Sequence, residues 1–466
     1  MSDDSVLRWD ELRARLAATA GMRPVGLRHV VVGPGALGRL RSTVDELAAG
    51  RPGEIVVLRD GVPKMVGTAD LHATVAAALA PARELTLTGR HGHVQADEVT
   101  SDAAIAGVAG AAVLVTVGSG TLADLGKLAA ARNGAAHVIV QTAASVNGFA
   151  DDQSVLLRSG VKRTVASGWP DALIVDADVL AAAPAALNRA GVGDLLAMFT
   201  APADWLLATE VGFPDGYQAA AVDLVRPYGD RLLAASARLV ANDRAALTLL
   251  AELLTLSGVS MGAAGCTSPS SGMEHLISHL LEMRASAHGH PAASHGAQVG
   301  VGTLVAAALW ARVRLALAGP ATPEVRLPDA DAARRRVEAA FLPLDPTGAT
   351  AAECWRAYAE KLRRLADSLP RLRRLLGTWT EFDARLDGLL LAPDRLVGAL
   401  AELGAPTGFA ALRPEYTPEV AAWAIGNAHL MRERFTVADL ADLLGAGGPT
   451  GVEAVLTDLA ALGAGR

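Results

Sequence analysis

Histidines are concentrated in one short stretch of this chain, residues 272–302. Five of the eleven histidines fall there, namely His275, His279, His288, His290 and His295. Histidine is the commonest neutral metal ligand and the usual proton carrier near neutral pH. His275 and His279 are four residues apart, so a helix would present both on one face. The same spacing occurs on ordinary polar helix faces, and the pattern alone leaves both interpretations open.

A glycine turn follows a run of β-branched residues in the first half of the chain. Residues 113–117 read Val-Leu-Val-Thr-Val, and Gly118, Ser119, Gly120 and Thr121 then lead into a helical stretch. A glycine turn between a strand and a helix lets backbone N–H groups approach a phosphate, and the helix dipole favours the anion. The motif is neither a GxGxxG fingerprint nor a P-loop. It therefore predicts either a phosphate site or simply a tight strand–helix turn.

Charged residues accompany this turn. Asp124 and Lys127 are one turn apart at the start of the following helix, where they would either face the phosphate site or form a solvated ion pair. Asp60 ends another β-branched run, and acidic residues at strand ends often bind a ribose hydroxyl. Asp60 also fits a turn residue in the sequence Arg59-Asp60-Gly61, so both interpretations stay open.

A second polar segment follows the next predicted strand. Thr142, Ser145 and Asn147 place two hydroxyls and an amide at the carboxyl edge of the predicted sheet, where ligands of open α/β folds bind. Asp194 comes later, in a glycine-containing segment that we expect to start a helix. A carboxylate at a helix start can be a functional group or only a cap that the helix dipole favours.

Strand-like and helical segments alternate from residue 27 to residue 184, which is typical of a parallel, doubly wound sheet. The predicted strands are His29–Val32, Glu54–Leu58, Glu84–Thr88, Ala112–Val117, His137–Gln141 and Ala172–Asp176. The predicted helices are Ala36–Ala49, Asp70–Ala80, Asp97–Ala109 and Thr121–Asn133. From Ala185 onward helical periodicity takes over. The sequence thus predicts an α/β domain over residues 1–183 and an all-α domain over residues 184–466.

Composition narrows the class of protein. The chain has 466 residues and a formal charge of −7, which argues against nonspecific nucleic-acid binding. Cys266 and Cys354 match no zinc-ribbon or CxxC spacing, so we expect free thiols and a reducing cytoplasm. The N-terminal residues lack the pattern of a secretory signal. Apolar stretches such as Val301–Trp310 are too short to span a bilayer.

Several short motifs, taken in order, resemble one family. They are Gly118-Ser119-Gly120-Thr121 with Asp124 and Lys127, Thr142-Ala143-Ala144-Ser145, Gly193-Asp194-Leu195-Leu196, Gly272-Met273-Glu274-His275, His295-Gly296-Ala297-Gln298-Val299-Gly300, Gly404-Ala405-Pro406-Thr407 and residues 431–440. This ordered set resembles the sn-glycerol-1-phosphate dehydrogenase branch of the iron-containing alcohol dehydrogenase and dehydroquinate synthase superfamily. The resemblance covers most of residues 27–445.

The resemblance implies a Rossmann-like NAD(P)-binding domain, a helical domain, and a divalent metal with the cofactor in the cleft between them. It assigns the metal to Asp194, His275 and His295. These ligands suit zinc, with iron or nickel as alternatives, and leave coordination positions open for substrate. The implied reaction is hydride transfer between the nicotinamide and a polyol or hydroxyketone, with the metal as a Lewis acid.

The resemblance also places the cofactor, NAD or NADP. Its pyrophosphate and nicotinamide end would be held by Gly118, Ser119, Gly120, Asp124 and Lys127, with Thr121 in the same turn and Thr142 and Ser145 lining the site. Asp60 is our candidate for the ribose. His279 lies one turn beyond His275. We expect it either to support the metal site or relay protons there, or to be an ordinary polar residue of the helix. We expect His288 and His290 in a solvated loop.

Three positions depart from the pattern of this branch. Asn147 stands where a substrate-contacting Asp is usual, and an amide can hydrogen-bond but cannot act as a base. Met198 replaces a lysine and Ser268 replaces an arginine. Lysine and arginine are the usual phosphate binders, so these two replacements predict either an altered substrate or a phosphate bound elsewhere.

The sequence leaves two other functions open. A dehydroquinate-synthase-like sugar-phosphate cyclase would use NAD transiently, although the glycine turn of such enzymes usually reads differently. A noncatalytic ligand-binding homologue would have lost its site, whereas Asp194, His275 and His295 are all present here. The resemblance further suggests a homo-oligomer.

Overall fold

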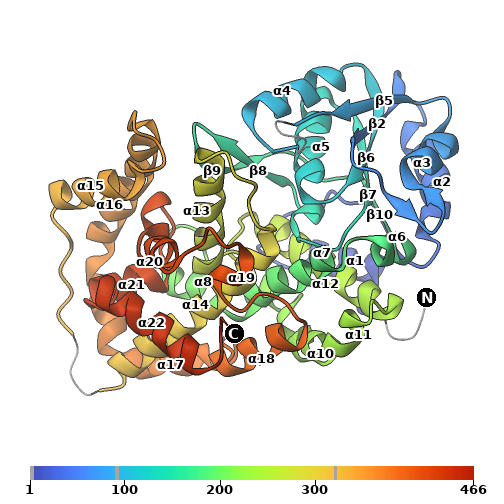
Figure 1. Cartoon of the computed structure of the whole chain (residues 1–466). Coiled ribbons are helices and arrows are strands. Elements are labelled where there is room, and N and C mark those ends of the chain that lie inside the picture. The colour runs from blue at the N-terminus through green and yellow to red at the C-terminus, as the bar shows by residue number, and fades with distance from the viewer. Residues whose placement is uncertain (1–4, 90–93, 320–322, 466) are drawn as a thin grey trace. The chain divides into compact units, whose positions relative to one another are not determined.

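The computed structural model describes residues 5–89, 94–319 and 323–465. The chain divides into two compact units, shown in Figure 1. Unit 1 comprises Met1–Arg158, Lys162–Leu195 and Asp230–Gly265. Unit 2 comprises Ser159–Val161, Leu196–Gly229 and Cys266–Arg466. This division differs from the predicted boundary between residues 183 and 184, because two helical segments beyond that boundary pack with the α/β core of unit 1.

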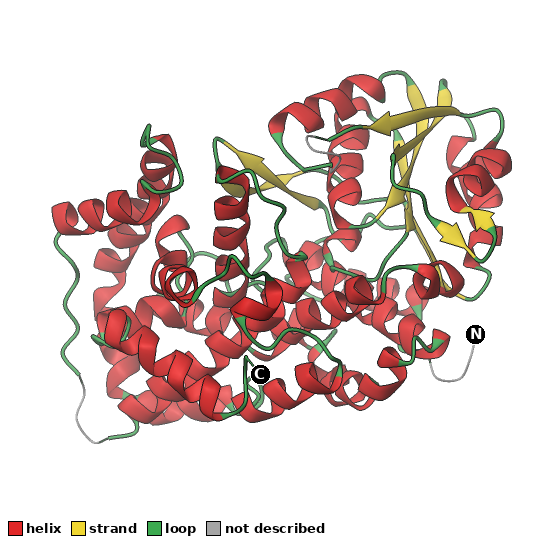
Figure 2. Ribbon diagram, in the orientation of Figure 1, coloured by secondary structure: helices red, strands yellow, loops and turns green. Residues whose placement is uncertain are grey.

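Unit 1 is built on a six-stranded parallel sheet, drawn in yellow in Figure 2. Its strands are β1 (His29–Gly33), β2 (Glu54–Asp60), β5 (Arg83–Leu87), β6 (Ala111–Gly118), β7 (Ala136–Gln141) and β10 (Ala172–Asp176). Their order across the sheet is β1-β10-β7-β6-β2-β5, with every neighbouring pair parallel. All six predicted strands are present, and the predicted parallel α/β fold is confirmed.

The helices of unit 1 cover both faces of this sheet. They are α1 (Trp9–Ala18), η1 (Ala36–Arg39), α2 (Leu40–Ala48), α3 (Leu71–Leu79), α4 (Glu98–Gly107), α5 (Gly120–Asn133), η3 (Gly148–Ala150), α6 (Ala177–Ala182), α7 (Ala185–Leu195), α10 (Gly229–Ala234), α11 (Ser236–Val240) and α12 (Arg244–Ala264). Figure 1 shows α2 and α3 on one side of the sheet and α4 and α5 on the other. The helix α12 contacts α6, α7 and β1, which explains why it belongs to unit 1.

Alternation along the strands divides the apolar core into two layers. Val113 and Val115 of β6 pack in one cluster with Leu40 of α2. Leu114, which lies between them in sequence, packs in a second cluster with Leu125 of α5. Successive strand residues point to opposite faces, so a continuous apolar run is what a strand covered on both sides requires.

Two short hairpins were absent from the prediction. They are β3 (Met65–Val66) with β4 (Ala69–Asp70), and β8 (Gln153–Arg158) with β9 (Val161–Ala166). Residues 153–158 and 161–166 mix polar and charged residues with apolar ones, so they lack the continuous apolar run of a central strand.

From residue 177 onward the described residues form helices and loops, and the prediction of helical structure from Ala185 onward is confirmed. The elements beyond those of unit 1 are η4 (Leu196–Phe199), α8 (Ala201–Val211), α9 (Ala219–Val222), η5 (Arg226–Tyr228), α13 (Met273–Ala287), α14 (His295–Leu317), α15 (Ala330–Phe341), α16 (Ala349–Gly377), α17 (Trp379–Leu386), α18 (Pro393–Glu402), α19 (Phe409–Leu412), α20 (Pro418–Asn427), η6 (Ala428–Met431), α21 (Val437–Leu443) and α22 (Pro449–Ala461). The helix α14 is central to unit 2 and contacts α13, α18, α21 and α22.

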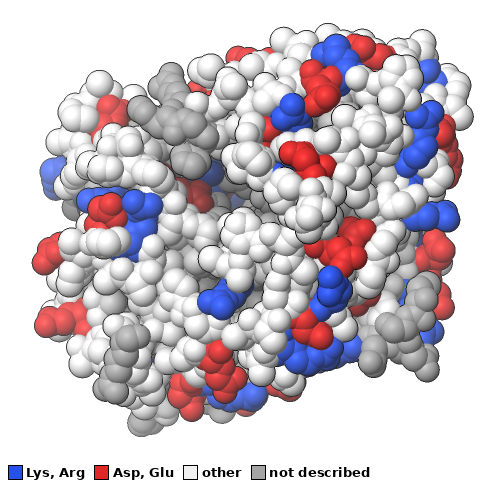
Figure 3. Space-filling model, turned by 45° about the vertical axis from the view of Figure 1, so that its right-hand side comes forward, with Lys and Arg blue, Asp and Glu red and all other residues white. Residues whose placement is uncertain are grey.

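Two helices are long and apolar enough to cross a membrane by length and composition alone. These helices are α12 and α14, and their most apolar windows are 89% and 72% buried within the protein. Burial in a protein core accounts for such apolar character as well as a membrane would. On the face shown in Figure 3, Lys and Arg side chains are interspersed with Asp and Glu.

One buried histidine in the sheet makes unit 1 sensitive to acid. The His137 ring shares a hydrogen bond of 2.9 Å with the Thr116 hydroxyl, and Gly126 of α5 leaves just enough room for both side chains. Burial, together with the charge of Lys127, lowers the pKa of His137 to about 3. The ring is therefore neutral in the folded protein at every pH above that value.

We expect the stability of unit 1 to fall as the pH drops from about 6.5 towards 3. In that window the unfolded chain binds a proton at His137 and the folded chain does not. Proton binding therefore favours unfolding, and near pH 3 it lowers the free energy of unfolding by about 4 kcal/mol. His137→Gln keeps a neutral hydrogen-bonding side chain and should lose this part of the pH dependence. Urea unfolding of both proteins at pH 7 and pH 4 measures the difference. Equal pH dependence in the two proteins would contradict the assignment.

Candidate functional site

The predicted phosphate turn lies at the carboxyl edge of the sheet in unit 1. It connects β6 to α5, and Ser119 caps that helix without a side-chain hydrogen bond. A Cβ on Gly118 would lie 2.4 Å from Leu122 Cδ1, and one on Gly120 would lie 2.7 Å from Val146 Cγ2. Close packing therefore requires glycine at 118, where Leu122 Cβ would also lie within 2.5 Å, whereas a Cβ at 120 would have to displace one methyl group of Val146. The tight turn leaves the first backbone N–H groups of a 14-residue helix facing this edge.

The second polar segment lies beside this turn. The Thr142 N–H donates to the Gly118 carbonyl at 3.1 Å, and β6 and β7 are neighbours in the sheet. Thr142 and Ser145 are both buried. The structure thus brings together the glycine turn and the Thr142–Ser145 segment, as the predicted cofactor site requires.

Asp60 also reaches this edge, because β2 is the other neighbour of β6 and ends at this residue. Its carboxylate accepts hydrogen bonds from the Val62 N–H at 3.1 Å and from the Lys64 ammonium. Both Asp60 and Lys64 are partly exposed. An acidic residue at this place suits a ribose hydroxyl, and a cation beside it was not foreseen from the sequence.

Lys127 differs from its predicted role. Its side chain is buried, and the ammonium donates to the Asp151 carboxylate at 2.5 Å, to the Gly148 carbonyl at 2.5 Å and to the Gln153 carbonyl. Asp124 lies 3.4 Å away as a second acidic neighbour. Burial lowers the pKa of Lys127, but the two carboxylates outweigh it and the net shift is upward.

All three ammonium donors of Lys127 are therefore used inside unit 1. The residue ties the segment that follows Asn147 to α5, and no donor remains for a cofactor phosphate. The interpretation of Asp124 and Lys127 as a solvated ion pair is also wrong, because Lys127 is fully buried.

Asp194 is held against the same polar segment. Its Oδ2 accepts a hydrogen bond of 2.8 Å from the Asn147 N–H, and the Asn147 amide donates to Ser257 Oγ at 3.0 Å. Asn188, one and a half turns earlier, accepts from the Ala144 N–H at 3.0 Å. Asp194 and Asn147 are both buried.

The predicted position of Asp194 at a helix start is wrong, because it lies in the last turn of α7. Gly191, in the same helix, serves close packing against the polar segment. A Cβ on Gly191 would approach the Ala144 carbonyl oxygen to 1.9 Å, so only glycine allows α7 to lie so close to the polar segment.

Three histidines cluster in unit 2. His275 and His279 lie on α13, and His295 is the first residue of α14. Ring centroids are 5.3 Å apart for His275 and His295, 5.5 Å for His279 and His295, and 6.2 Å for His275 and His279. Close packing of the two helices brings the rings together, since a Cβ on Gly302 of α14 would lie 2.6 Å from the Glu274 carbonyl oxygen.

Each of the two predicted histidine ligands has a carboxylate partner. His275 Nδ1 lies 3.1 Å from Glu274 Oε1, and His295 Nδ1 lies 2.9 Å from Glu282 Oε1. Ser278 Oγ is a further neighbour of His295 Nδ1 at 3.1 Å. A carboxylate beside Nδ1 makes that nitrogen the N–H donor and leaves the Nε2 lone pair for a metal. The donor set in unit 2 therefore fits a divalent ion.

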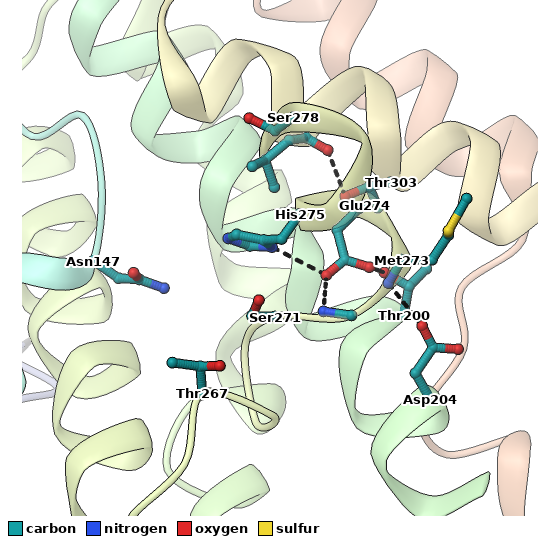
Figure 4. Close-up of polar contacts among 12 residues, drawn as sticks. Asn147, Thr200, Asp204, Thr267, Ser271, Met273, Glu274, His275, Ser278 and Thr303 are labelled. Carbon is teal, nitrogen blue, oxygen red and sulfur yellow. Dashed lines mark hydrogen bonds and ion pairs between the residues drawn. The ribbon is translucent and has the colours of Figure 1, made fainter. Parts of the chain in front are cut away.

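Glu274 is itself fixed by hydrogen bonds that Figure 4 shows. It accepts from the Gly272 N–H at 2.5 Å and from the Thr200 hydroxyl at 2.9 Å. A second buried carboxylate, Asp204, accepts from the Met273 N–H at 2.8 Å. Burial and the charge of Glu274 raise the pKa of Asp204 to about 8. The start of α13, two residues before His275, is thus held at both its backbone and its side chains.

Asp204 also links the two histidine-bearing helices to the C-terminal region. Its Oδ1 accepts from the Trp310 indole N–H of α14 at 3.1 Å and from the Val437 N–H at 3.0 Å. Sequence reasoning missed these orienting residues, which are Asp204, Glu274, Ser278 and Glu282. Glu274 and Glu282 precede and follow the histidines of α13, and acidic neighbours of histidine were the signal that could have found them.

The other histidines of residues 272–302 differ in burial. His279 is buried, and burial, followed by the charges of Arg432 and His295, holds the pKa of His279 well below its ordinary value. Its Nδ1 has no hydrogen-bond partner among the described residues. The ring is therefore neutral at pH 7. His288 and His290 are exposed at the end of α13 and in the loop that follows, as predicted.

Comparisons with known proteins agree with this arrangement. Residues 31–184 match the family model described as iron-containing alcohol dehydrogenase. A glycerol-1-phosphate dehydrogenase [NAD(P)+] of Haloquadratum walsbyi is 33% identical over 304 residues, covering 64% of this chain and 83% of that protein. The enzyme of the same name from Bacillus licheniformis is 36% identical over 215 residues, covering 46% of this chain and 53% of that protein.

Solved structures extend the likeness of fold over most of the chain. A probable glycerol dehydrogenase from Sinorhizobium meliloti superposes with a TM-score of 0.56 at 21% identity, covering 94% of this chain and 96% of that one. An iron-containing alcohol dehydrogenase from Corynebacterium glutamicum superposes with a TM-score of 0.55 at 17% identity, covering 92% of this chain and 98% of that one. With the sequence identities above, these findings show that the chain belongs to the glycerol-1-phosphate dehydrogenase branch of the iron-containing alcohol dehydrogenase superfamily.

Proposed function

We propose that this chain is a metal-dependent dehydrogenase that transfers hydride between NAD(P) and a small polyol or hydroxyketone, with glycerol 1-phosphate as the first substrate to test. Membership of the family makes the chain an NAD(P)-linked oxidoreductase. The observation that carries the proposal within the structure is the pair His275 and His295, each with a carboxylate at Nδ1.

The proposed metal ligands are Asp194, His275 and His295. The two histidines belong to unit 2, and Asp194 is two residues before the chain enters that unit at Leu196. An Asp/His/His set suits zinc, with iron or nickel as alternatives. When bound, such an ion supplies a Lewis acid that stabilises negative charge on a substrate oxygen.

The chain's own residues supply position and polarity. Glu274 and Glu282 hold the histidine rings, so that the ligand nitrogens are preorganised. The neutral ring of His279 is proposed to accept or donate a proton near the substrate hydroxyl. Asn147, whose backbone anchors Asp194, is proposed to hydrogen-bond the substrate and not to act as a base.

The cofactor is proposed to lie along the carboxyl edge of the sheet in unit 1. The turn Gly118-Ser119-Gly120-Thr121 would receive the pyrophosphate at the start of α5, and Thr142 and Ser145 would line the same site. Asp60 would bind the ribose. Lys127 would contribute indirectly, by fixing the segment after Asn147.

Lys64 is expected to govern the choice between NADP and NAD. A lone carboxylate at Asp60 would favour a ribose hydroxyl and repel a 2′-phosphate, whereas the adjacent ammonium attracts that phosphate. Lys64→Met should lower kcat/KM with NADPH about tenfold or more and leave the value with NADH within about twofold. Initial rates with both cofactors measure the ratio, and the NADH rate is the internal control. An unchanged ratio would remove Lys64 from the cofactor site.

The proposal as a whole is tested by an NAD(P)H absorbance screen. Purified protein, stripped of metal with a chelator and reconstituted with Zn²⁺, Fe²⁺ or Ni²⁺, is offered polyols and ketoses with and without phosphate. We expect metal-dependent, stoichiometric NAD(P)H consumption with at least one hydroxyketone. Turnover without net change in NAD(P)H would indicate a cyclase instead. Failure to bind any metal after reconstitution would support a noncatalytic protein.

A further inference from the structure

The helix that carries His275 begins without a capping side chain of its own. Its N-cap is Gly272, and Met273 is its first residue. The first backbone N–H groups of a helix have no partner within the helix and need an acceptor from elsewhere. Two buried carboxyl groups supply it here, because Glu274 accepts from the Gly272 N–H at 2.5 Å and Asp204 of α8 accepts from the Met273 N–H at 2.8 Å. Figure 4 shows Asp204, Met273 and Glu274 near one another at this helix start.

The sequence of α8 directs two side chains to this place. Thr200 precedes α8 as its N-cap, and Asp204 follows four residues later, so both side chains lie on the same side of the helix. The Thr200 hydroxyl donates to Glu274 at 2.9 Å. Gly272 leaves room for both carboxyl groups, because a Cβ there would lie 2.7 Å from Asp204 Oδ2 and 3.1 Å from Glu274 Oε2. The place of Asp204 therefore affects Glu274, the carboxylate beside His275 Nδ1.

The other oxygen of Asp204 is held by two further segments. Oδ1 accepts from the Trp310 indole N–H at 3.1 Å and from the Val437 N–H at 3.0 Å. Trp310 belongs to α14, which begins at His295, and Val437 is the first residue of α21. Asp204 is only 1% exposed, so these hydrogen bonds are shielded from water. One buried carboxyl group thus joins α8, α13, α14 and α21, and two of these helices carry the histidines of the proposed metal site.

We propose that Asp204 is a positioning residue for the metal site, which fixes the start of α13 against α14 and α21 and thereby orients the pair of Glu274 and His275. The inference rests on the proposed function, because the metal ligands belong to that function. A carboxyl group can accept on both oxygens, whereas an amide accepts on one only. Asparagine at position 204 would therefore turn its NH2 group toward an N–H donor in either orientation, and at least one of the three hydrogen bonds would be lost.

The test compares Asp204→Asn with wild type, both stripped of metal and titrated with Co²⁺. Competition with a chelator gives the affinity, and the visible absorption of bound Co²⁺ reports the geometry of its ligands. We expect Asp204→Asn to bind Co²⁺ about 10- to 100-fold more weakly, with altered absorption bands. In the metal-loaded enzyme kcat should fall, while KM for the nicotinamide changes by less than about threefold.

Asp439→Asn is the matched control. Asp439 is also a buried carboxyl group at the start of a helix in unit 2, but its hydrogen bonds go to Thr436 and Lys361. This variant should lower Tm and leave the affinity for Co²⁺ within about threefold of wild type. A purely structural role gives a different result. Wild-type affinity and spectrum in an Asp204→Asn protein of lowered Tm would overturn the proposal, and so would equal weakening in both variants at an equal loss of Tm.

A milder substitution covers the case in which Asp204→Asn does not fold. Trp310→Phe removes one of the three hydrogen bonds and must weaken Co²⁺ binding relative to Trp423→Phe, whose lost indole N–H donates to the Ala340 carbonyl at 2.9 Å. Equal affinity in these two variants would overturn the proposal.

The proposed function can fail separately. Wild type that binds Co²⁺ without NAD(P)-linked turnover refutes the dehydrogenase, and the comparison of affinities still tests Asp204. Normal turnover by wild type, with unchanged affinity in Asp204→Asn, refutes only the positioning role. Wild type that binds no metal refutes both.

Discussion

His295→Ala is expected to lose the bound metal and to reduce kcat/KM by about 10³-fold or more. The variant removes one of only three proposed protein ligands, and the Glu282 carboxylate would be left without its imidazole partner. Metal content by elemental analysis and initial rates with NAD(P)H measure the two effects. His290→Ala is the matched control, because it removes an exposed histidine a few residues away in the loop and should change neither quantity.

A substitution of Glu282, the carboxylate partner of His295, should have a smaller effect on metal binding than removal of His295 itself. Glu282→Gln retains a hydrogen-bond acceptor but removes the charge beside His295 Nδ1. Loss of a carboxylate that orients a ligand histidine typically weakens metal binding about 10- to 100-fold without abolishing it. A full metal complement with wild-type affinity in His295→Ala would refute the ligand assignment. Wild-type affinity in Glu282→Gln alone would refute only the orienting role of Glu282.

Lys127→Met is expected to lower the free energy of unfolding by about 3–5 kcal/mol. The substitution leaves the buried Asp151 carboxylate without its partner at 2.5 Å, and Asp124 without its partner at 3.4 Å. Chemical denaturation at pH 8 measures the loss. Lys64→Met serves as the control, because Lys64 also pairs with one aspartate but is partly exposed, and exposed pairs contribute about 1 kcal/mol or less.

Two further measurements separate the ion pair from simple loss of packing. Adding Asp151→Asn to Lys127→Met removes the orphaned charge and should restore part of the stability. Burial already raises the pKa of Asp151 to about 6, and removal of the cation can only raise that pKa further. An acid with a raised pKa in the folded state is stabilised as the pH falls, so the defect should be smaller at pH 5 than at pH 8. A defect equal at both pH values would contradict this account.

Much of the fold was predictable from the sequence because local pattern determines it. In residues 113–117 only Thr116 is polar, and such a nearly continuous apolar run is typical of a strand covered on both faces. The glycines at 118 and 120 mark the turn at the end of that strand. The hairpins at 65–70 and 153–166 were not predictable, because neither shows an apolar run. The placement of Asp194 was wrong because the glycines suggested a turn, whereas Gly191 lies within a helix and allows that helix to pack closely.

The sequence by itself determined which residues could do chemistry: the histidines of residues 272–302, the glycine turn, and the order of motifs that identifies the family. Only the tertiary structure decided what each of them does. In the folded chain His275 pairs with Glu274, and His295 pairs with Glu282. Every N–H donor of the Lys127 ammonium is hydrogen-bonded inside unit 1. Arg434 contacts Thr267 and Ser271. The physical reason is that hydrogen-bond partners are chosen by distance in space. Residues more than 160 positions apart share no local pattern that could reveal their contact.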